Sequence, residues 1–318
     1  MKTQEEDRFF QYGCQHPIRF YGFKRLLYPL IDAFLHLTVR LVPDKDVSYY
    51  RYGLSAVLIF KDEAPFLREW IEYHLLVGVE HFYLYQNNSS DSYLSEIQDY
   101  LDSGTVTLIE WPDSPGQYSA YRHWYTNHRR ETKWVTFIDI DEFLCPNRAD
   151  NIEQILDKFQ RYPVILVYWK MFGTGGQLIH NYQKTVIEQY TCCRPKLFSE
   201  GKIIYNTRFD ISSKIISMHY SCAKVGLISI PPVNTFSRFV IWDLHRANKD
   251  GENPLQLNHY WSKSYDCWKK KYDKGSVEKG IRYRDYAFFE RLERQCTSTD
   301  YTIFRFLISL KIKLNQKT

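Results

Sequence analysis

Three acidic residues, Asp139, Asp141 and Glu142, lie within Trp134 to Pro146, WVTFIDIDEFLCP, a run that otherwise has the composition of a buried strand. On an extended strand, Asp139 and Asp141 would share one face, with their Cα atoms roughly 7 Å apart. Two carboxylates about 4 Å apart repel by about 4 kcal/mol at an effective dielectric of about 20, and a divalent cation reverses this. Oxygen ligands favour Mg²⁺ or Mn²⁺, often shared with substrate phosphates. The pattern therefore predicts a metal site that also binds a phosphorylated ligand.

An isolated D-x-D tripeptide is common, and the competing interpretation is a strand end whose acids are solvated in a turn. The elements around the acids must decide between the two. From Gly53 onward, strand-like and helix-like stretches alternate at short intervals, which is typical of a mostly parallel sheet covered by helices. The sequence predicts strands at 54–60, 81–85, 105–111, 134–143 and 164–170, and helices at 64–77, 93–101, 117–133 and 151–162.

This order predicts an α/β, Rossmann-like fold, although the G-x-G-x-x-G turn of dinucleotide-binding proteins is absent from the sequence. Ser90 and Asp91 precede the helix predicted at 93–101 and are suited to cap it. A chain of 318 residues can bury one large core of this kind. The formal charge of +5 is modest and the basic residues are dispersed, which argues against a nucleic-acid groove and leaves anionic substrates or membrane surfaces open.

The seven cysteines show no CxxC spacing, which argues against a zinc site. The start MKTQEEDRFF is acidic and lacks an apolar signal core, so we expect a cytoplasmic chain with reduced thiols. Residues 26–42 and 301–314 are apolar but interrupted by charge, so neither is expected to span a bilayer. Core packing is favoured for both, and peripheral association with the inner face of a membrane remains an alternative.

Several motifs in one order resemble glycosyltransferase family 92, formerly domain of unknown function 23, and bacterial relatives of the broad glycosyltransferase family 2 type. The likeness covers roughly residues 55–274. It is carried by KDEA at 61–64, EWIEYH at 69–74, GVEHFYLY at 78–85, NNSSD at 87–91, WVTFIDIDEFL at 134–144, FGTGG at 172–176, NHY at 258–260 and KS at 263–264. Several motifs in the right order are far more specific than a lone D-x-D.

The resemblance implies the nucleotide-sugar-binding GT-A fold, a divalent metal held by the D-x-D, and sugar transfer with inversion at the anomeric carbon. Eukaryotic members of the family include galactosyltransferases that use a UDP-activated donor. The chain would then consist of an N-terminal extension at 1–52 with an amphipathic helix, a GT-A domain at 53–275 and a basic helical tail at 276–318. The expected function is metal-dependent transfer of a hexose from a nucleotide-diphosphate sugar to a glycan or lipid-linked acceptor, in surface polysaccharide assembly.

Carried over by residue, Asp139 and Asp141 would hold Mn²⁺ or Mg²⁺ against the donor diphosphate. His259 would supply a further metal or phosphate contact, unless it is a structural or surface histidine. The end of the first strand, with Lys61 and Glu63, and the adjacent loop, with Asn88 and Asp91, would bind the nucleotide. Asp139 would contribute to the same binding site. Relatives usually have Asp where this chain has Gln86, which puts the choice of nucleotide in doubt.

Trp169, Phe172 and the glycines that follow would border the acceptor, although Trp169 is equally suited to the core. Inverting transfer also needs a carboxylate base near the acceptor hydroxyl, and spacing does not rank the candidates Glu142, Asp210, Asp243 and Glu252. Two rival functions remain: a metal-dependent nucleotidyltransferase or phosphohydrolase, and a non-catalytic carbohydrate-binding scaffold. No Gly-rich phosphate loop with Lys is present, which argues against a P-loop enzyme.

Overall fold

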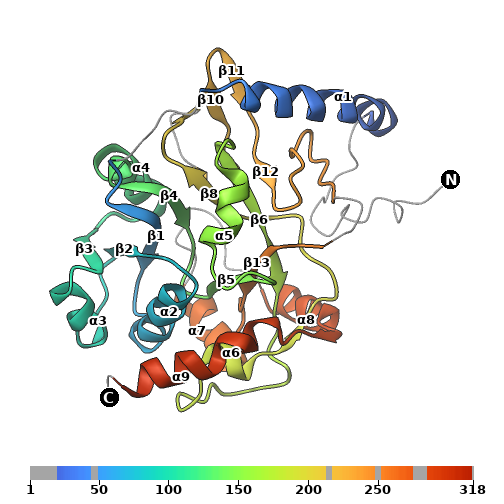
Figure 1. Ribbon diagram of the computed structural model, residues 1–318. Coiled ribbons are helices and arrows are strands. Elements are labelled where there is room, and N and C mark those ends of the chain that lie inside the picture. Colours follow the sequence, from blue (N-terminus) through green and yellow to red (C-terminus); the bar gives the residue numbers. More distant parts are fainter. Residues whose placement is uncertain (1–19, 44–48, 213–216, 248–251, 275–284, 317–318) are drawn as a thin grey trace.

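A mixed β-sheet forms the centre of the molecule in the computed structural model, which describes residues 20–43, 49–212, 217–247, 252–274 and 285–316 (Figure 1). Its strands follow the order β3-β2-β1-β4-β8-β6-β13-β5, and β12 pairs with β6. Strands β3 (Val106–Glu110), β2 (His81–Gln86), β1 (Tyr52–Phe60) and β4 (Thr132–Phe137) are parallel. Their carboxyl ends therefore meet at one edge of the sheet, beside the three acids.

The second half of the sheet is mixed. Strand β8 (Gly201–Asn206) is antiparallel to both β4 and β6 (Val164–Met171), and β6 is parallel to β13 (Leu255–His259) and β12 (Val233–Asn234). Strand β5 (Glu142–Pro146) closes the sheet antiparallel to β13. This topology confirms the predicted α/β class with a mostly parallel sheet.

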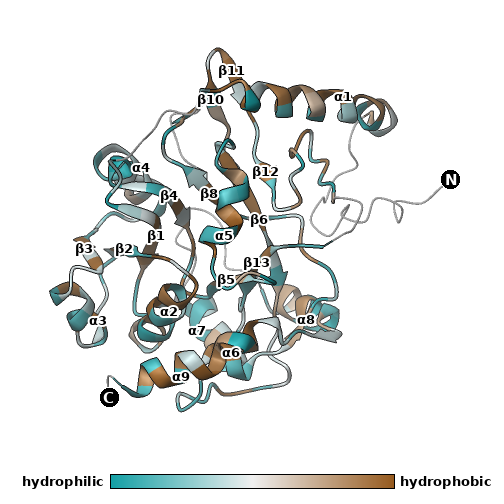
Figure 2. Cartoon of the chain, viewed as in Figure 1, coloured by the Kyte–Doolittle hydropathy of each residue, from teal (hydrophilic) through white to brown (hydrophobic). Residues whose placement is uncertain are grey.

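Helices cover both faces of the sheet. On β1, Ala56 and Leu58 belong to one hydrophobic cluster with Trp70 of α2 (Ala64–Leu76), whereas Val57 belongs to a second cluster with Trp124 of α4 (Gln117–Asn127). This division follows from the period of two along a strand. The first cluster also contains residues of α3 (Tyr93–Asp102) and α9 (Leu307–Asn315). Figure 2 shows the hydrophobic residues concentrated on the central strands.

The remaining elements surround this core. Within the described residues they are α1 (Tyr21–Arg40), α5 (Glu153–Leu156), α6 (Val186–Gln189), α7 (Tyr265–Lys274), α8 (Tyr286–Gln295), the 3₁₀ turns Arg129–Glu131, Asp157–Phe159 and Thr302–Phe306, and the short strands β7 (Cys192–Cys193), β9 (Asp210–Ile211), β10 (Ala223–Val225), β11 (Ile228–Ile230) and β14 (Ser298–Thr299). None of the helices in the described ranges is both long and apolar enough to cross a bilayer. The acidic start of the chain, residues 1–10, and residues 276–284 of the expected tail lie outside the described residues.

Most predicted elements agree with the structure to within two residues, and three differ. The helix predicted at 117–133 ends at Asn127, because a 3₁₀ turn follows and Thr132 already begins β4. The helix predicted at 151–162 is reduced to α5 and one 3₁₀ turn. The strand predicted at 134–143 breaks after Phe137 and resumes as β5 at Glu142, so that the acids lie in a turn.

Candidate active site

The turn between β4 and β5 positions the three acids. Because β4 ends at Phe137, the prediction that Asp139 and Asp141 lie on an extended strand is wrong. The indole nitrogen of Trp70 fixes the turn, at 3.1 Å from the carbonyl oxygen of Asp139 and 3.0 Å from that of Glu142. The turn gives all three carboxylates polar partners, which buried acids require.

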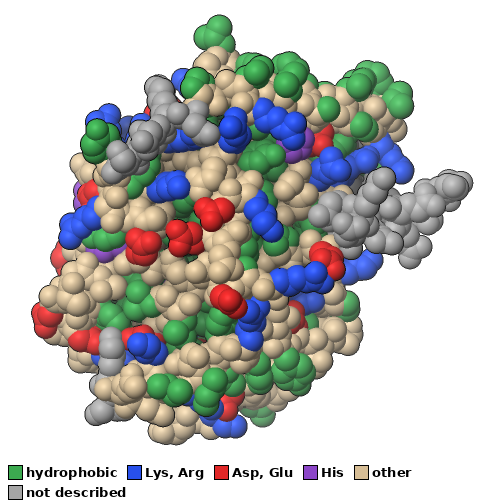
Figure 3. All heavy atoms as spheres, in the orientation of Figure 1, with side chains coloured by type: hydrophobic (Ala, Val, Ile, Leu, Met, Phe, Trp, Pro, Cys, Tyr) green, Lys and Arg blue, Asp and Glu red, His purple; other side chains and the backbone are tan. Residues whose placement is uncertain are grey.

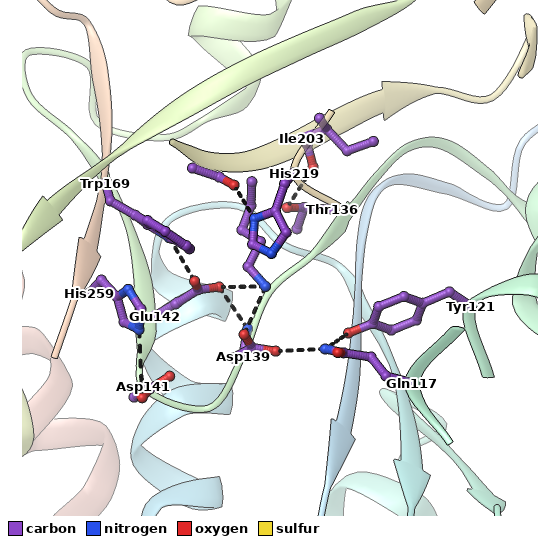
Figure 4. A network of polar contacts seen from close by, with 12 residues as sticks. Gln117, Tyr121, Thr136, Asp139, Asp141, Glu142, Trp169, Ile203, His219 and His259 are labelled. Atoms are coloured by element: carbon purple, nitrogen blue, oxygen red, sulfur yellow. Dashed lines mark hydrogen bonds and ion pairs between the residues drawn. The ribbon is translucent and has the colours of Figure 1, made fainter. Parts of the chain in front are cut away.

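Asp139 forms an ion pair with a buried lysine from the antiparallel strand β8. The Lys202 ammonium donates to Asp139 Oδ2 at 2.7 Å and lies 3.7 Å from Glu142 Oε2. Figure 4 shows Asp139, Asp141 and Glu142 together on the turn. Burial alone would lower the pKa of Lys202, but the charges of Asp139 and Glu142 outweigh it and raise that pKa. The Asp139 side chain stays 36% exposed, whereas that of Lys202 is 2% exposed. Asp139 is therefore the acid of the turn that a ligand from solvent can reach.

Asp141 has a different set of partners. Its Oδ2 atom accepts a hydrogen bond from Lys271 of α7 and lies 3.7 Å from His259 Nε2, at the end of β13. Burial would raise the pKa of Asp141, but Lys271 and then His259 outweigh it and hold that pKa well below its usual range. Burial lowers the pKa of His259, which is therefore neutral near pH 7. The structure thus brings Asp141 and His259 together as predicted, with a lysine beside them.

Glu142 is fully buried and both its oxygens are engaged. Oε1 accepts the indole N–H of Trp169 at 2.7 Å, and Oε2 accepts the backbone N–H of Asp139 at 2.8 Å. Burial raises the pKa of Glu142 well above its usual range, with the charge of Asp139 adding to the effect. Glu142 therefore holds the turn together, and Trp169 is its partner within the core.

Lys263 is the third lysine at this site and differs from the other two. It is 1% exposed, its backbone φ is 51°, and its ammonium lies 4.1 Å from the centre of the Phe66 ring. Within the described ranges, no hydrogen bond or ion pair engages this ammonium. Its pKa is lowered, first by burial and then by Lys271. The charge of Lys263 also acts on Asp141, so the three lysines surround the acids at one site.

The donor atoms here fit a partial metal site. An ionised Asp141 and a neutral His259 are in the protonation states that ligate metals. His259 Nδ1 is buried without a hydrogen-bond partner in the described part of the chain. No three His, Cys, Asp or Glu side chains among the described residues form a complete cluster. A divalent cation such as Mg²⁺ or Mn²⁺ would take its remaining ligands from water and substrate phosphates.

The loops after β1 and β2 were predicted to bind the nucleotide, and the structure gives some of their polar groups local partners. Asp91 Oδ2 accepts the backbone N–H of Ala64 at 2.8 Å, so Asp91 caps α2. The prediction that Asp91 caps α3 is wrong. Asn88 donates to the carbonyl of Pro112 at 3.1 Å, and both Asn88 and Lys61 are exposed.

Glu63 and Gln86 lie at the same edge of the sheet, where β1 and β2 end. Glu63 is half-buried and close enough for its charge to act on Lys263. Gln86 is buried, donating to Tyr93 Oη at 3.1 Å and accepting from the Ser89 backbone at 3.2 Å. An amide at this position therefore braces the loop from within.

The remaining carboxylates proposed as general base lie in other surroundings. Asp210 pairs with Arg129 at 2.7 Å, and Glu252 pairs with Arg148. Asp243 is exposed, with a backbone φ of 61°. The described contacts therefore do not connect any of these three with the acidic turn.

Two histidines, His219 and His259, lie around the turn together with the three lysines. Of these five residues, only His259 was predicted from the sequence to be a ligand. The second histidine, His219, donates from Nδ1 to the carbonyl of Gly201 at 2.8 Å, and burial lowers its pKa to about 4. Its ring stacks edgewise on Trp169 at 5.3 Å between centres, and His259 contacts the same ring at 4.8 Å. Three packed rings, those of Trp169, His219 and His259, therefore lie beside the charged groups.

The family model for glycosyltransferase family 92 matches residues 56–282, more than two thirds of the chain. The chain belongs to glycosyltransferase family 92. The match includes the acidic turn, His259 and all three lysines. The order β3-β2-β1-β4, with one antiparallel strand before β6, is the GT-A arrangement that the resemblance implied.

Three curated plant relatives are similar to this family 92 chain. A glycosyltransferase family 92 protein of Oryza sativa subsp. japonica is 26% identical over 70% of this chain and 35% of its own length. A family 92 protein of Arabidopsis thaliana is 36% identical over 63% of this chain and 37% of its own length. The galactan beta-1,4-galactosyltransferase GALS3 of Arabidopsis thaliana is 26% identical over 37% of this chain and 26% of its own length. The chain thus spans about a third of the length of the two family 92 relatives.

Among solved structures, the S. aureus TarS fragment 1–349 shows a partial likeness. It has a TM-score of 0.33 and 14% identity, covering 49% of this family 92 chain and 47% of that structure.

Proposed function

We propose that this family 92 chain is a metal-dependent, inverting glycosyltransferase that moves a hexose from a nucleotide-diphosphate sugar, a UDP-sugar, to a glycan or lipid-linked acceptor. The observation that carries the proposal is the acidic turn with Lys202, Lys263 and Lys271 around it. Acids and lysines balance one another there, so a cation and a polyanion can enter together with little change in net charge.

Asp141 and His259 would hold the metal, with Asp139 on its exposed side. A bound divalent cation would act as a Lewis acid that stabilises the charge developing on the departing nucleoside diphosphate. Lys263 and Lys271 would bind the phosphate oxygens, because each ammonium lies close enough to act on Asp141. The donor would thus be fixed by charge at one end of the sheet.

In the transfer, an acceptor hydroxyl oxygen forms the new bond to the anomeric carbon, on the face opposite the diphosphate. The bond from that carbon to the diphosphate oxygen breaks, and the leaving group retains the electron pair. The hydroxyl proton passes to a carboxylate base. The name of the galactosyltransferase relative supports a hexose as the group transferred.

The test is a thermal-shift series with UDP-glucose, UDP-galactose, their GDP and dTDP counterparts and free UDP, each with and without Mn²⁺. A ligand bound by the folded state raises the melting temperature, and we expect the largest rise with a UDP-sugar and Mn²⁺ together. Sugar incorporated into an acceptor would then separate transfer from the rival nucleotidyltransferase, which releases pyrophosphate. If no nucleotide sugar raises the melting temperature at millimolar concentration with Mn²⁺, the proposal is wrong.

A further inference from the structure

Helix α1 presents an apolar stripe to solvent. Its large exposed side chains are spaced three or four residues apart, as one face of a helix requires, and are between 55% and 74% exposed: Phe23, Leu26, Leu30, Phe34, Leu37 and Leu41 at its end. Scattered single apolar residues on a surface are ordinary, but a contiguous row of this length marks an interaction site. Figure 3 shows these hydrophobic side chains gathered over α1, with Lys and Arg beneath them.

The opposite face of α1 is anchored in the protein. Tyr28 donates to the carbonyl of Phe239 at 2.7 Å, and Asp32 accepts from the Phe239 backbone and from Arg238, each at 2.9 Å. His36 bonds Tyr162 at 2.9 Å. The stripe therefore lies on a helix held in place by polar contacts, and its exposure does not arise from a detached segment.

The charge pattern of α1 decides what the stripe fits. Its basic residues are Lys24, Arg25 and Arg40, and its one carboxylate, Asp32, is buried and faces inward. An exposed apolar stripe flanked by cations and free of outward acids is the pattern of a helix that lies in an anionic membrane interface. At the same end of the molecule in Figure 1, the β10–β11 hairpin carries the fully exposed Leu227.

We propose that the outer face of α1 binds the surface of an anionic lipid bilayer, with its apolar stripe at the acyl boundary and its basic side chains at the headgroups. This goes beyond the proposed transfer activity, since it assigns a lipid partner to a surface far from the acids. Tyr162, the partner of α1, precedes the start of β6 at Val164, whereas His259 pairs with Met171 at the end of that strand. Variants of the stripe should therefore leave donor binding unchanged.

The experiment is sedimentation of the full chain with vesicles of phosphatidylcholine alone or with phosphatidylglycerol added. Leu26→Gln with Leu30→Gln removes two stripe residues, 74% and 70% exposed, while keeping a good helix former. The matched control is Ile308→Gln with Ile312→Gln on α9, which are 67% and 50% exposed with the same four-residue spacing. We expect binding only with phosphatidylglycerol, weakened by salt, and reduced at least ~10-fold in the α1 variant but not in the control.

Three outcomes would overturn the proposal. The first is no sedimentation with phosphatidylglycerol vesicles at low salt. The second is equal loss in the α1 variant and the α9 control. The third is a dimer in light scattering that the α1 variant converts to monomer without any vesicle binding, which would assign the stripe to a second copy of the chain. UDP binding, measured on the same preparations, keeps these results separate from a failure of the proposed function.

Discussion

Replacement of Lys263, the buried lysine for which the described residues provide no ion pair, tests the donor site most directly. In Lys263→Met, a side chain of similar length keeps the contact with the Phe66 ring, while the ammonium is lost. Both residues meet the same backbone cost at a φ of 51°. We expect the variant to be more stable than the wild type and to bind nucleoside diphosphate more weakly, because a buried cation without an ion pair disfavours folding and favours an anionic ligand.

The magnitude follows from the surroundings of Lys263. Its pKa is lowered by burial and by Lys271, so removal of the charge should stabilise the fold by about 1–2 kcal/mol, or roughly 2–4 °C in melting temperature. An ammonium about 4 Å from a phosphate contributes up to about 4 kcal/mol at an effective dielectric of about 20, and desolvation reduces this. A rise of at least ~10-fold in the Kd for UDP, or about 1.4 kcal/mol, is therefore expected.

The assay is titration calorimetry of UDP with Mn²⁺ together with thermal unfolding of the same samples. Lys270→Met on α7 is the matched control, because the Lys270 side chain is 63% exposed and its nearest carboxylate is Asp266 at 3.6 Å. The control should keep the wild-type affinity. A Kd for UDP unchanged within twofold in Lys263→Met, or a loss of stability with UDP binding intact, would refute the reasoning.

Three further predictions concern acids of this chain. Asp139→Asn and Asp141→Asn should each lower turnover by at least ~100-fold, and EDTA should inhibit the wild type until Mn²⁺ is restored; near-wild-type transfer rates would contradict this. Burial raises the pKa of Glu69 from 4.5 to about 7, so its stabilising contribution is complete below pH 4.5 and lost as pH rises through about 7. The unfolding free energy of the wild type minus that of Glu69→Gln should therefore fall by roughly 3 kcal/mol between pH 4 and 8 in urea titrations, whereas a flat difference would contradict the assignment. Glu142→Ala should lower the unfolding free energy by about 3 kcal/mol or more, since it leaves the Trp169 indole unpaired, while Glu142→Gln should cost less; equal losses would argue against this hydrogen bond.

The sequence predicted the α/β class and most elements because apolar runs and helical periodicity are local signals. It missed the break in the strand at Phe137, because Ile138 and Ile140 continue the alternation that marks a strand. Only tertiary contacts, chiefly those of the Trp70 indole with two carbonyls of the turn, show where the backbone leaves the sheet.

The acids and His259 were named from sequence because motifs mark them, whereas Lys202 and Lys271, which pair with the two aspartates, were not. Lys202 has a weak signal, a single charge in the apolar strand GKIIYN. Lys271 has none, since it is one of three consecutive lysines, and only the packing of α7 selects it. Lys202 and Lys271 lie 63 and 130 positions from the aspartates that they contact, and residue spacing does not predict contacts over such separations.

These lysines bear on how a donor could bind at all. The carboxylates of Asp139 and Asp141 are each paired with a lysine, so the protein itself stabilises their charges. A cation at Asp141 would compete with the Lys271 ammonium for the same carboxylate, and a diphosphate arriving with it would offer that ammonium new partners. Mn²⁺ alone should therefore bind weakly, whereas Mn²⁺ together with UDP should bind tightly. Only when both bind does each lysine or aspartate that loses an ion pair gain a new one. Mn²⁺ titrated by electron paramagnetic resonance should show this coupling, with Lys271→Met binding Mn²⁺ alone more tightly than the wild type. Equal Mn²⁺ affinity in the two proteins would mean that Lys271 does not compete for Asp141.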